Sequence, residues 1–253
     1  MIIIMKKKEY CSLGIMSGTS LDGIDFSLLK TDGRENINFI FNEYSKLSNQ
    51  FQENVRSLIN KFNSLDYKYM IESSEYLKFN KFFTDHIFKR ILYVLKKKSI
   101  SISSIDVIGL HGNTLLHKPD KGLSIQLGNA EYLSKKLKIP VISTFRNNDI
   151  KTGGQGAPLV PIFHQYQFSE DNKNIIVINI GGISNFSLIS NKKLILASDI
   201  GPGNKLLDEY CQKMFNQDFD KDGLLASKGK ILSNLVDTWK KFKFLKECFP
   251  ISY

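Results

Sequence analysis

The sequence predicts an α/β fold whose beginning is repeated, and three observations support this prediction. Residues 13–29 and 177–189 are apolar runs broken by small-residue turns, which is typical of β-hairpins. Apolar residues recur at helical spacing through residues 49–98. Short apolar strands are expected at residues 105–109 and 141–145. Strands that alternate with helices indicate an α/β architecture, in which ligands bind beyond the strand ends.

The remaining elements follow from the same patterns. The first hairpin is expected to span residues 10–29 and to lead to a strand near residues 39–44. Helices are expected at residues 130–138 and 205–215, the second entered through a Gly-Pro-Gly turn. The apolar stripes within residues 49–98 are interpreted as helix faces that pack on a core, not as a cofactor-binding surface.

The charge of the chain raises the question of a nucleic-acid partner, since the net charge of its 253 residues is +10. Nearly all of that charge is lysine, because the arginines are Arg34, Arg56, Arg90 and Arg146. Lysine is a solvated point charge that offers no bidentate contact to bases or phosphates. The lysines are also spread along the sequence, so no nucleic-acid partner is expected.

Cysteine usage and the N-terminal residues favour a cytoplasmic location. The three cysteines are widely spaced and form no C-x-x-C pair, so neither a zinc site nor a disulfide framework is expected. The apolar stretch at residues 1–5 is short and precedes its positive charges, which argues against a signal peptide. No apolar run approaches the roughly 20 residues that cross a bilayer, so no membrane partner is expected.

The turns of the two hairpins are candidate anion sites. Both turns are rich in Gly and in small polar residues. Exposed backbone N–H groups at such turns bind phosphate oxygens. Two of them in one chain indicate a duplicated fold in which both turns face one anionic ligand.

Several polar residues near these turns have both a structural and a functional interpretation. Asp22 is a common turn former, but together with Asp25 it also has the chemistry to hold Mg²⁺ near a phosphate. Asp199 is either a helix-capping carboxylate or a general base. His111 is either a hydrogen-bonded turn histidine or a functional residue. Residue types alone leave these alternatives open.

Four motifs together resemble the anhydro-N-acetylmuramic acid kinase family. They are Gly14-Ile-Met-Ser-Gly-Thr-Ser-Leu-Asp-Gly-Ile-Asp25, Gly153-Gly-Gln-Gly-Ala-Pro-Leu-Val-Pro161, Asn179-Ile-Gly-Gly-Ile-Ser-Asn185 and Asp199-Ile-Gly-Pro-Gly-Asn204. The resemblance implies duplicated domains of the actin-like ATPase (ribonuclease H-like) fold. It implies a first lobe at residues 1–145 and a second, incomplete lobe at residues 146–253.

The resemblance also implies a reaction and its cofactors. In that reaction ATP, with Mg²⁺, phosphorylates the 6-hydroxyl of 1,6-anhydro-N-acetylmuramic acid while water opens the anhydro bridge. The product is N-acetylmuramic acid 6-phosphate, and the step belongs to peptidoglycan recycling. Asp199 is implied as the base that activates the water, and Asp22 as the residue near the metal. For phosphoryl transfer itself, a protein chiefly positions the reactants and stabilises the charge on the phosphates.

The other residues implied by the resemblance fall into two groups. Those expected to bind ATP are Gly18, Thr19, Ser20, Leu21, Asp22, Gly23, Ile24 and Asp25 in the first turn, and Gly181, Gly182 and Asn185 in the second. Those expected to border the sugar are His111, Asn113, Arg146, Gly153, Gly154, Gln155 and Gly156. The family resemblance also implies a homodimer.

The chain departs from the family pattern in three ways. Asn113 stands where many relatives have Gln. Asn147 and Asn148 follow Arg146 where many relatives have further arginines. Relatives also continue beyond a motif whose beginning resembles residues 249–253. The second lobe is therefore expected to be incomplete, and an uncovered lobe exposes apolar side chains, here Trp239, Phe242, Phe244 and Leu245.

This incompleteness leaves two alternatives to an active kinase. The first is a catalytically weak or inactive remnant that acts at most as a phosphate- or sugar-binding module. The second is a hydrolase of the same superfamily that acts on a phosphate ester. A hydrolase would release free phosphate without phosphorylating sugar.

Overall fold

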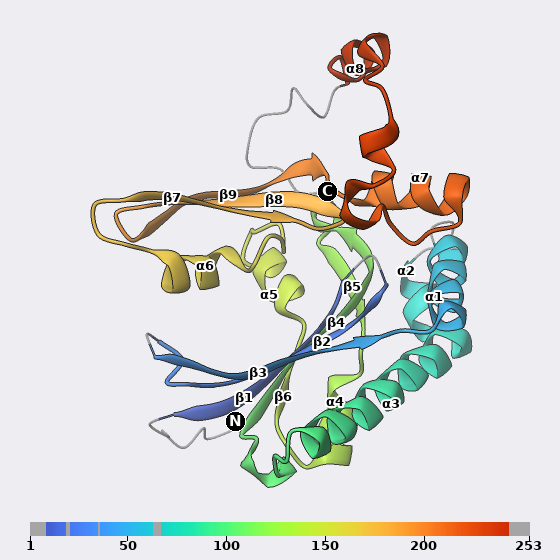
Figure 1. Ribbon diagram of the computed structural model, residues 1–253. Helices are drawn as coiled ribbons and strands as arrows, with labels where there is room; N and C mark the ends of the chain where they lie inside the picture. The colour runs from blue at the N-terminus through green and yellow to red at the C-terminus, as the bar shows by residue number, and fades with distance from the viewer. Residues whose placement is uncertain (1–8, 19–20, 35, 63–66, 243–253) are drawn as a thin grey trace. The chain divides into compact units, whose positions relative to one another are not determined.

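A computed structural model describes residues 9–18, 21–34, 36–62 and 67–242 (Figure 1). The chain divides into two compact units, Met1–Gly156 and Ala157–Tyr253. The lobe boundary expected between residues 145 and 146 falls at the start of helix α5 (Phe145–Lys151), which packs with strand β5 of the first unit. Each unit is described by itself below.

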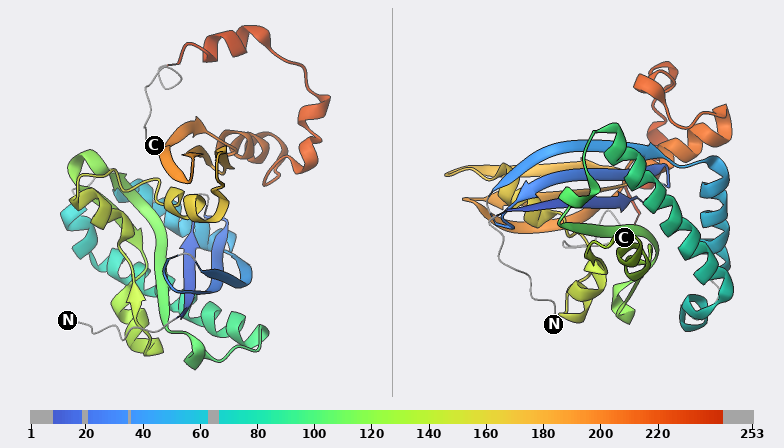
Figure 2. Two further views of the ribbon diagram at one scale, coloured as in Figure 1. Left: turned by 90° about the vertical axis from the view of Figure 1, so that its left-hand side faces the viewer. Right: turned by 90° about the horizontal axis from the view of Figure 1, so that it is seen from below.

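The first unit is built on one mixed sheet. Its strands are β1 (Tyr10–Ser17), β2 (Gly23–Thr31), β3 (Ile37–Lys46), β4 (Val107–Lys118), β5 (Leu123–Leu127) and β6 (Val141–Ile142). The order is β3-β2-β1-β4-β5, with β6 also paired to β4. The pairs β1–β2, β2–β3 and β4–β5 are antiparallel, whereas β1–β4 and β4–β6 are parallel. Figure 2 shows the twist of this sheet in two further views.

Helices fill the crossover that the parallel pair β1–β4 requires. They are α1 (Asn49–Phe62), α2 (Tyr67–Glu72) and α3 (Ser74–Lys97), followed by the short turn η1 (Ile102–Ser104). Helix α3 buries Phe83, Ile87 and Ile91 in the core, as the helical spacing predicts. On the sheet, alternate residues of β1 such as Leu13 and Ile15 are buried, which is the period-2 pattern of a strand with one face on a core.

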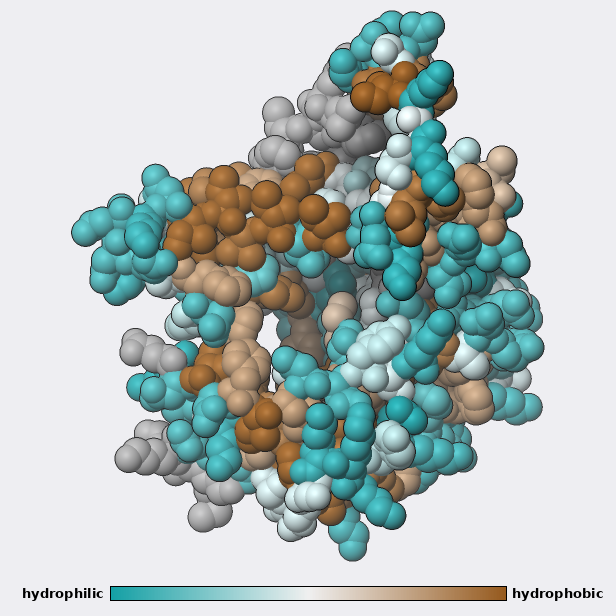
Figure 3. All heavy atoms as spheres, in the orientation of Figure 1, coloured by the Kyte–Doolittle hydropathy of each residue, from teal (hydrophilic) through white to brown (hydrophobic). Residues whose placement is uncertain are grey.

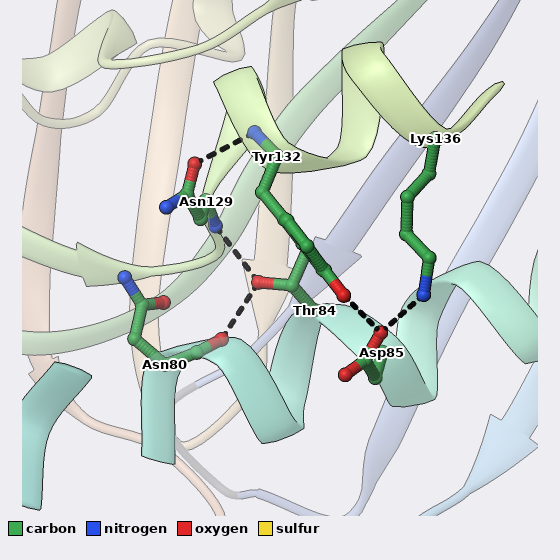
Figure 4. A network of polar contacts seen from close by, with 6 residues as sticks. All are labelled: Asn80, Thr84, Asp85, Asn129, Tyr132 and Lys136. Carbon is green, nitrogen blue, oxygen red and sulfur yellow. Dashed lines mark hydrogen bonds and ion pairs between the residues drawn. The ribbon is translucent and has the colours of Figure 1, made fainter. Parts of the chain in front are cut away.

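A polar network fixes helix α4 (Ala130–Leu137), which follows β5, against α3 (Figure 4). The Thr84 hydroxyl is fully buried; it donates to the Asn80 carbonyl (2.7 Å) and accepts from the Asn129 N–H (2.9 Å). Asn129 in turn caps α4 by accepting from the Tyr132 N–H at 2.9 Å. The Tyr132 hydroxyl donates to Asp85 at 2.9 Å. Because the buried Thr84 hydroxyl both donates and accepts, this network positions the β5–α4 connection.

The second unit begins with helix α6 (Pro161–Phe168) and a three-stranded antiparallel sheet. The strands β7 (Asn174–Ile180), β8 (Ile183–Ser190) and β9 (Lys193–Pro202) pair in sequence order. Helix α7 (Lys205–Phe215), the turns η3 (Lys221–Gly223) and η4 (Ala226–Lys228), and helix α8 (Ser233–Trp239) follow. Since β1, β2 and β3 form the same kind of meander, the repeated beginning predicted from the sequence is confirmed, as is the α/β class.

One face of the β7–β9 sheet is apolar and exposed. Helix α6 contacts the opposite face, where the His164 ring is hydrogen-bonded to the Ser187 hydroxyl at 2.9 Å. Ile176, Ile178 and Ile180 point away from that face and are 60%, 59% and 62% exposed. Figure 3 shows apolar side chains gathered over this sheet. Helix α7 adds further exposed apolar residues, namely Leu206, Leu207, Tyr210 and Met214.

The expected exposure of aromatic residues near the C-terminal end is confirmed where the structure describes it. Trp239 is 51% exposed and Phe242 is 47% exposed. Phe244 and Leu245 lie outside the described residues. In the described ranges no helix has both the length and the apolar composition to cross a membrane.

Two strand predictions are wrong in extent. The strand expected at residues 105–109 runs on as β4 to Lys118, so that His111 lies within a strand and not after it. The strand expected at residues 141–145 stops at Ile142, and Phe145 begins helix α5. The turn η2 (Pro119–Lys121) then connects β4 to β5, a strand that the sequence patterns did not indicate.

Candidate functional site

The first candidate turn joins β1 to β2 in a compact, internally bonded loop. The Leu21 N–H donates to the Gly18 carbonyl (3.1 Å), and the Ser17 hydroxyl donates to the Gly23 carbonyl (2.9 Å). Leu21 has φ = +61°, the left-handed conformation that tight turns require, and its side chain is buried together with that of Ile24. Thr19 and Ser20 lie outside the described residues. The apolar members of this motif therefore anchor the turn in the core.

The turn is also held from the neighbouring strand by Asn113 of β4. The Asn113 Nδ2 donates to the Gly18 carbonyl at 2.7 Å and lies 3.3 Å from the Ser17 Oγ. Its side chain is only 1% exposed, and its Oδ1 is buried without a hydrogen-bond partner among the described residues. The predicted contact between Asn113 and sugar stays a prediction, while the structure shows it bonded to the turn.

Two carboxylates stand exposed beside this turn. The Tyr44 hydroxyl donates to Asp22 Oδ2 at 3.4 Å. Partial desolvation by the neighbouring chain, and then the charge of Asp22, raise the pKa of Asp25 although its side chain still reaches solvent. Such a pair of like charges favours a bound cation, and Mg²⁺ is commonly held by one or two carboxylates together with phosphate oxygens and water. The donor set thus fits magnesium, although the described residues contain no cluster of three metal-ligating side chains.

Arg146 and His111 form a second polar group in the first unit. The Arg146 Nε donates to His111 Nε2 at 3.1 Å, and the His111 Nδ1 lies 3.1 Å from the Gly112 carbonyl. Since Nε2 accepts, the ring proton resides on Nδ1 and donates to that carbonyl. Burial, and then the charge of Arg146, lower the pKa of His111, against the opposing effect of the Gly112 carbonyl. His111 is therefore a neutral acceptor that orients Arg146.

The glycine loop predicted to border the sugar joins this group. The Arg146 Nη1 donates to the Gly156 carbonyl at 3.2 Å. Asp149, which sequence reasoning did not single out, accepts from the Gly156 N–H through Oδ2 at 2.7 Å. Gln155 is exposed. Burial lowers the pKa of His117, and a hydrogen bond between His117 and the Gln155 backbone partly opposes that effect. The structure thus brings His111, Arg146 and the loop together.

Asn147, one of the departures from the family pattern, has a structural partner. Its Oδ1 accepts from the Ser124 N–H of β5 at 3.0 Å. The Ser124 hydroxyl lies 3.0 Å from His117 Nδ1 and accepts from Gln126 Nε2 at 2.6 Å. Asn147 therefore ties helix α5 to β5, a connection that an arginine, which has no acceptor, does not make.

The second candidate turn, between β7 and β8, is bonded to the loop that precedes α7. The Gly181 carbonyl accepts from the Asn204 N–H (2.7 Å), and the Gly182 carbonyl accepts from the Gly203 N–H (2.9 Å). In a trans peptide the C=O and N–H point in opposite directions. The N–H groups of Gly182 and Ile183 therefore point away from that loop.

Asp199 lies inside strand β9, next to this turn, and is only 7% exposed. Helix α7 starts only after Asn204, so the helix-capping interpretation of Asp199 is wrong. Asp199 stands opposite Asn185 of β8, and Asn185 stands opposite Asn179 of β7. Directly opposed residues share a face with Cβ atoms about 5 Å apart, so these three side chains form a polar row across the sheet. Asn179 was missed, although the hairpin register predicts it.

The expected site residues thus gather at separate places in the two units. In the first unit, the turn residues and Asn113 form one group, and His111, Arg146 and the glycine loop form another. In the second unit, Gly181, Gly182, Asn185 and Asp199 lie along one sheet and its turn.

Comparison with known proteins places the chain in one family. The family model described as anhydro-N-acetylmuramic acid kinase matches residues 10–252. A protein of that name from Pseudomonas syringae pv. tomato is 36% identical over 228 residues, which cover 90% of this chain and 60% of the relative. One from Pelagibacter ubique is 36% identical in an alignment 265 residues long, gaps included, which covers 98% of this chain and 68% of the relative.

Solved structures that the comparison matches to this chain are more distant. An Aquifex aeolicus Ppx/GppA phosphatase has a TM-score of 0.39 and 10% identity, covering 93% of this chain and 65% of that one. A ROK family glucokinase from Streptomyces griseus has a TM-score of 0.31 and 12% identity, covering 75% and 48%. The chain spans about three fifths to two thirds of the length of the curated relatives it matches. On the match over residues 10–252, the chain belongs to the anhydro-N-acetylmuramic acid kinase family.

Proposed function

We propose that the protein uses ATP to convert 1,6-anhydro-N-acetylmuramic acid and water into N-acetylmuramic acid 6-phosphate and ADP. The observation that carries the proposal is the buried Asp199, which stands opposite Asn185 on the sheet that contains the Gly181-Gly182 turn. A base beside a phosphate-binding turn is what a reaction combining water attack with phosphoryl transfer requires.

In this proposal the two hairpin turns bind the phosphates of ATP through their backbone N–H groups. The first turn contributes Gly18 and its neighbours up to Asp25, and the second contributes Gly181 and Gly182, with Asn185 beside them. Asp22, with Asp25 near it, would hold Mg²⁺, which neutralises charge on the phosphates. Both turns are held by hydrogen bonds of their own, which supports this role. Backbone N–H groups that are already fixed need little reorganisation when an anion binds.

Asp199 acts on the water in the proposed reaction. The water oxygen attacks the anomeric carbon, its proton passes to the Asp199 carboxylate, and the bond from that carbon to the bridging oxygen breaks. The released oxygen at C6 attacks the γ-phosphorus, and the bond to ADP breaks. The low exposure of Asp199 supports this role, since it limits the access of bulk water to the site where one water molecule reacts.

The sugar is proposed to lie against His111, Asn113, Arg146 and the loop from Gly153 to Gly156. The neutral His111 fixes Arg146, which in turn holds the Gly156 carbonyl.

We also propose a cytoplasmic location, lobes divided near residue 145, a homodimer and no nucleic-acid partner, as the sequence indicates.

Isotope labelling tests the proposed reaction. The purified chain is incubated with Mg-ATP and the anhydro sugar in H₂¹⁸O, and the product is examined by mass spectrometry. The expected product carries one phosphate and one ¹⁸O at the anomeric carbon. Asp199→Asn should lower the rate by at least about 100-fold, the effect of losing a general base, with ATP affinity unchanged. The matched control is Asp171→Asn, an exposed carboxylate of the same unit paired with Lys192. Free phosphate without a phosphorylated sugar would contradict the kinase.

A further inference from the structure

The loop that follows helix α5 is fixed by a residue whose role neither the motifs nor the family match assigns. Asp149 accepts from the Gly156 N–H through its side-chain Oδ2 at 2.7 Å. Its backbone carbonyl accepts from the Gly154 N–H at 2.9 Å and from the Thr152 N–H at 3.1 Å. One residue therefore holds the loop at three points.

The glycines of the loop are explained by this arrangement. A Cβ at Gly154 would lie 2.1 Å from Asp149 Oδ2, so the carboxylate occupies the space that a side chain would need. Gly156 has φ = +72°, and a Cβ there would lie 3.0 Å from the Arg146 carbonyl and 2.9 Å from Ile150 Cδ1. Glycine is thus required at position 156, where φ is positive and the α5 backbone lies close, and at position 154 it leaves room for the Asp149 carboxylate.

Arg146 completes the arrangement from the other side of Gly156. Asp149 binds the Gly156 N–H, and Arg146 binds the Gly156 carbonyl at 3.2 Å. The two side chains are three residues apart on α5 and so lie on the same side of the helix. Both peptide groups of Gly156 are therefore fixed, and Arg146 is itself held by His111.

We propose that Asp149 is a positioning residue that, with Arg146, fixes the backbone on both sides of Gln155 so that its side chain meets a hydroxyl-bearing sugar. Gln155 is exposed, while Gly156 beside it is buried. A carboxamide both donates and accepts, which matches sugar hydroxyl groups. A fixed backbone lowers the entropy lost when the side chain engages its ligand. The identity of the sugar rests on the proposed function, whereas the fixing of the loop does not.

Amide hydrogen exchange tests the fixing of the loop without any ligand. Asp149→Ala removes the acceptor and should speed exchange of the Gly156 amide by at least about tenfold, the effect of losing a hydrogen bond to a charged group. Asp149→Asn keeps an acceptor oxygen and should restore most of the protection. Glu53→Ala, an exposed acidic residue on α1, is the matched control and should leave the amide unchanged. Equal Gly156 exchange in Asp149→Ala and wild type would overturn the proposal.

Calorimetric titration with 1,6-anhydro-N-acetylmuramic acid tests the link to the ligand. Asp149→Ala and Gln155→Ala should each weaken sugar binding about tenfold, and Asp149→Asn should recover it. Only Asp149→Ala should also change Gly156 exchange. Sugar affinity that is unchanged in Asp149→Ala and Gln155→Ala would overturn the positioning role. If the wild-type chain binds no sugar at all, the proposed function and the positioning role toward sugar fail together, while fixing of the loop is judged from exchange.

Discussion

Replacing Asn113 tests how the first turn is held in place. In Asn113→Ala the Gly18 carbonyl loses its 2.7 Å hydrogen bond, and the Ser17 Oγ loses its 3.3 Å contact. The side chain is 1% exposed, so water does not readily replace these partners. The Gly18 carbonyl keeps its hydrogen bond from the Leu21 N–H, so the cost is that of one lost hydrogen bond, about 0.5–1.5 kcal/mol, to which the small cavity adds. We expect the free energy of unfolding of the first unit to fall by about 2 kcal/mol.

The assay is the denaturant dependence of amide exchange at buried positions of β1 and β4, which reports on the first unit alone. The matched control is Asn54→Ala on α1, whose side chain is exposed and accepts from Gln50 at 3.2 Å. Surface substitutions of this kind change stability by less than about 0.5 kcal/mol. Asn113→Gln, which introduces the residue of many relatives, should also destabilise by about 1–3 kcal/mol because the buried site is filled. Equal effects of Asn113→Ala and Asn54→Ala would refute the reasoning.

The other predictions concern pH, the second turn and the apolar face. The pKa of His111 is lowered from 6.5, so below about pH 6.5 the unfolded chain binds a proton that the folded chain does not. The free energy of unfolding should therefore fall as the pH drops from about 6.5 toward the folded-state pKa. An NMR titration with an ordinary or raised pKa for His111 would contradict this. Gly203→Ala places a Cβ 2.3 Å from the Gly181 carbonyl, so ATP affinity measured by calorimetry should fall, and unchanged affinity would argue against the second turn as a phosphate site. Ile178→Lys, at a side chain that is 59% exposed, should reduce binding of a hydrophobic dye and self-association in sedimentation, whereas identical behaviour to wild type would show that this face is not accessible in solution.

Local patterns were sufficient to predict the elements whose signal lies within a few residues. The helical stripe through Phe83, Ile87 and Ile91 is buried in α3, and both hairpins form with their small-residue turns. Helix α7 covers Lys205–Phe215, the range that the sequence predicts. In these segments the hydrophobic period and the turn residues point to the same structure, which is why the predictions succeed.

The structure predictions fail where a residue's conformation depends on contacts with residues that are distant in sequence. A turn was one interpretation of His111, but His111 and Gly112 lie within β4, where Gly112 has φ = +73° and a Cβ would fall 1.8 Å from the Leu127 carbonyl of β5. Strand β9 was not predicted from the sequence. Its pairing with β8 shifts register between Leu188 and Ile189, and such a shift breaks the regular alternation of apolar residues along a strand.

The candidate site shows the same division between local and distant information. The motifs identified Asp199, but only the strand register shows that Asn185 and Asn179 accompany it. Asn113 and Gly18 are 95 residues apart in sequence, so their hydrogen bond is invisible to local reasoning. Asp149 was overlooked for a different reason, because an acidic residue inside a short helix carries no distinctive local signal before the loop contacts are known.

The central claim is that this chain performs a sugar-dependent phosphoryl transfer. The most direct measurement is ADP release by the purified, folded chain with Mg-ATP, in the presence and absence of 1,6-anhydro-N-acetylmuramic acid. We predict that ADP release depends on the sugar and is abolished in Asp199→Asn. ADP release that is absent, or equal with and without the sugar, would contradict the account.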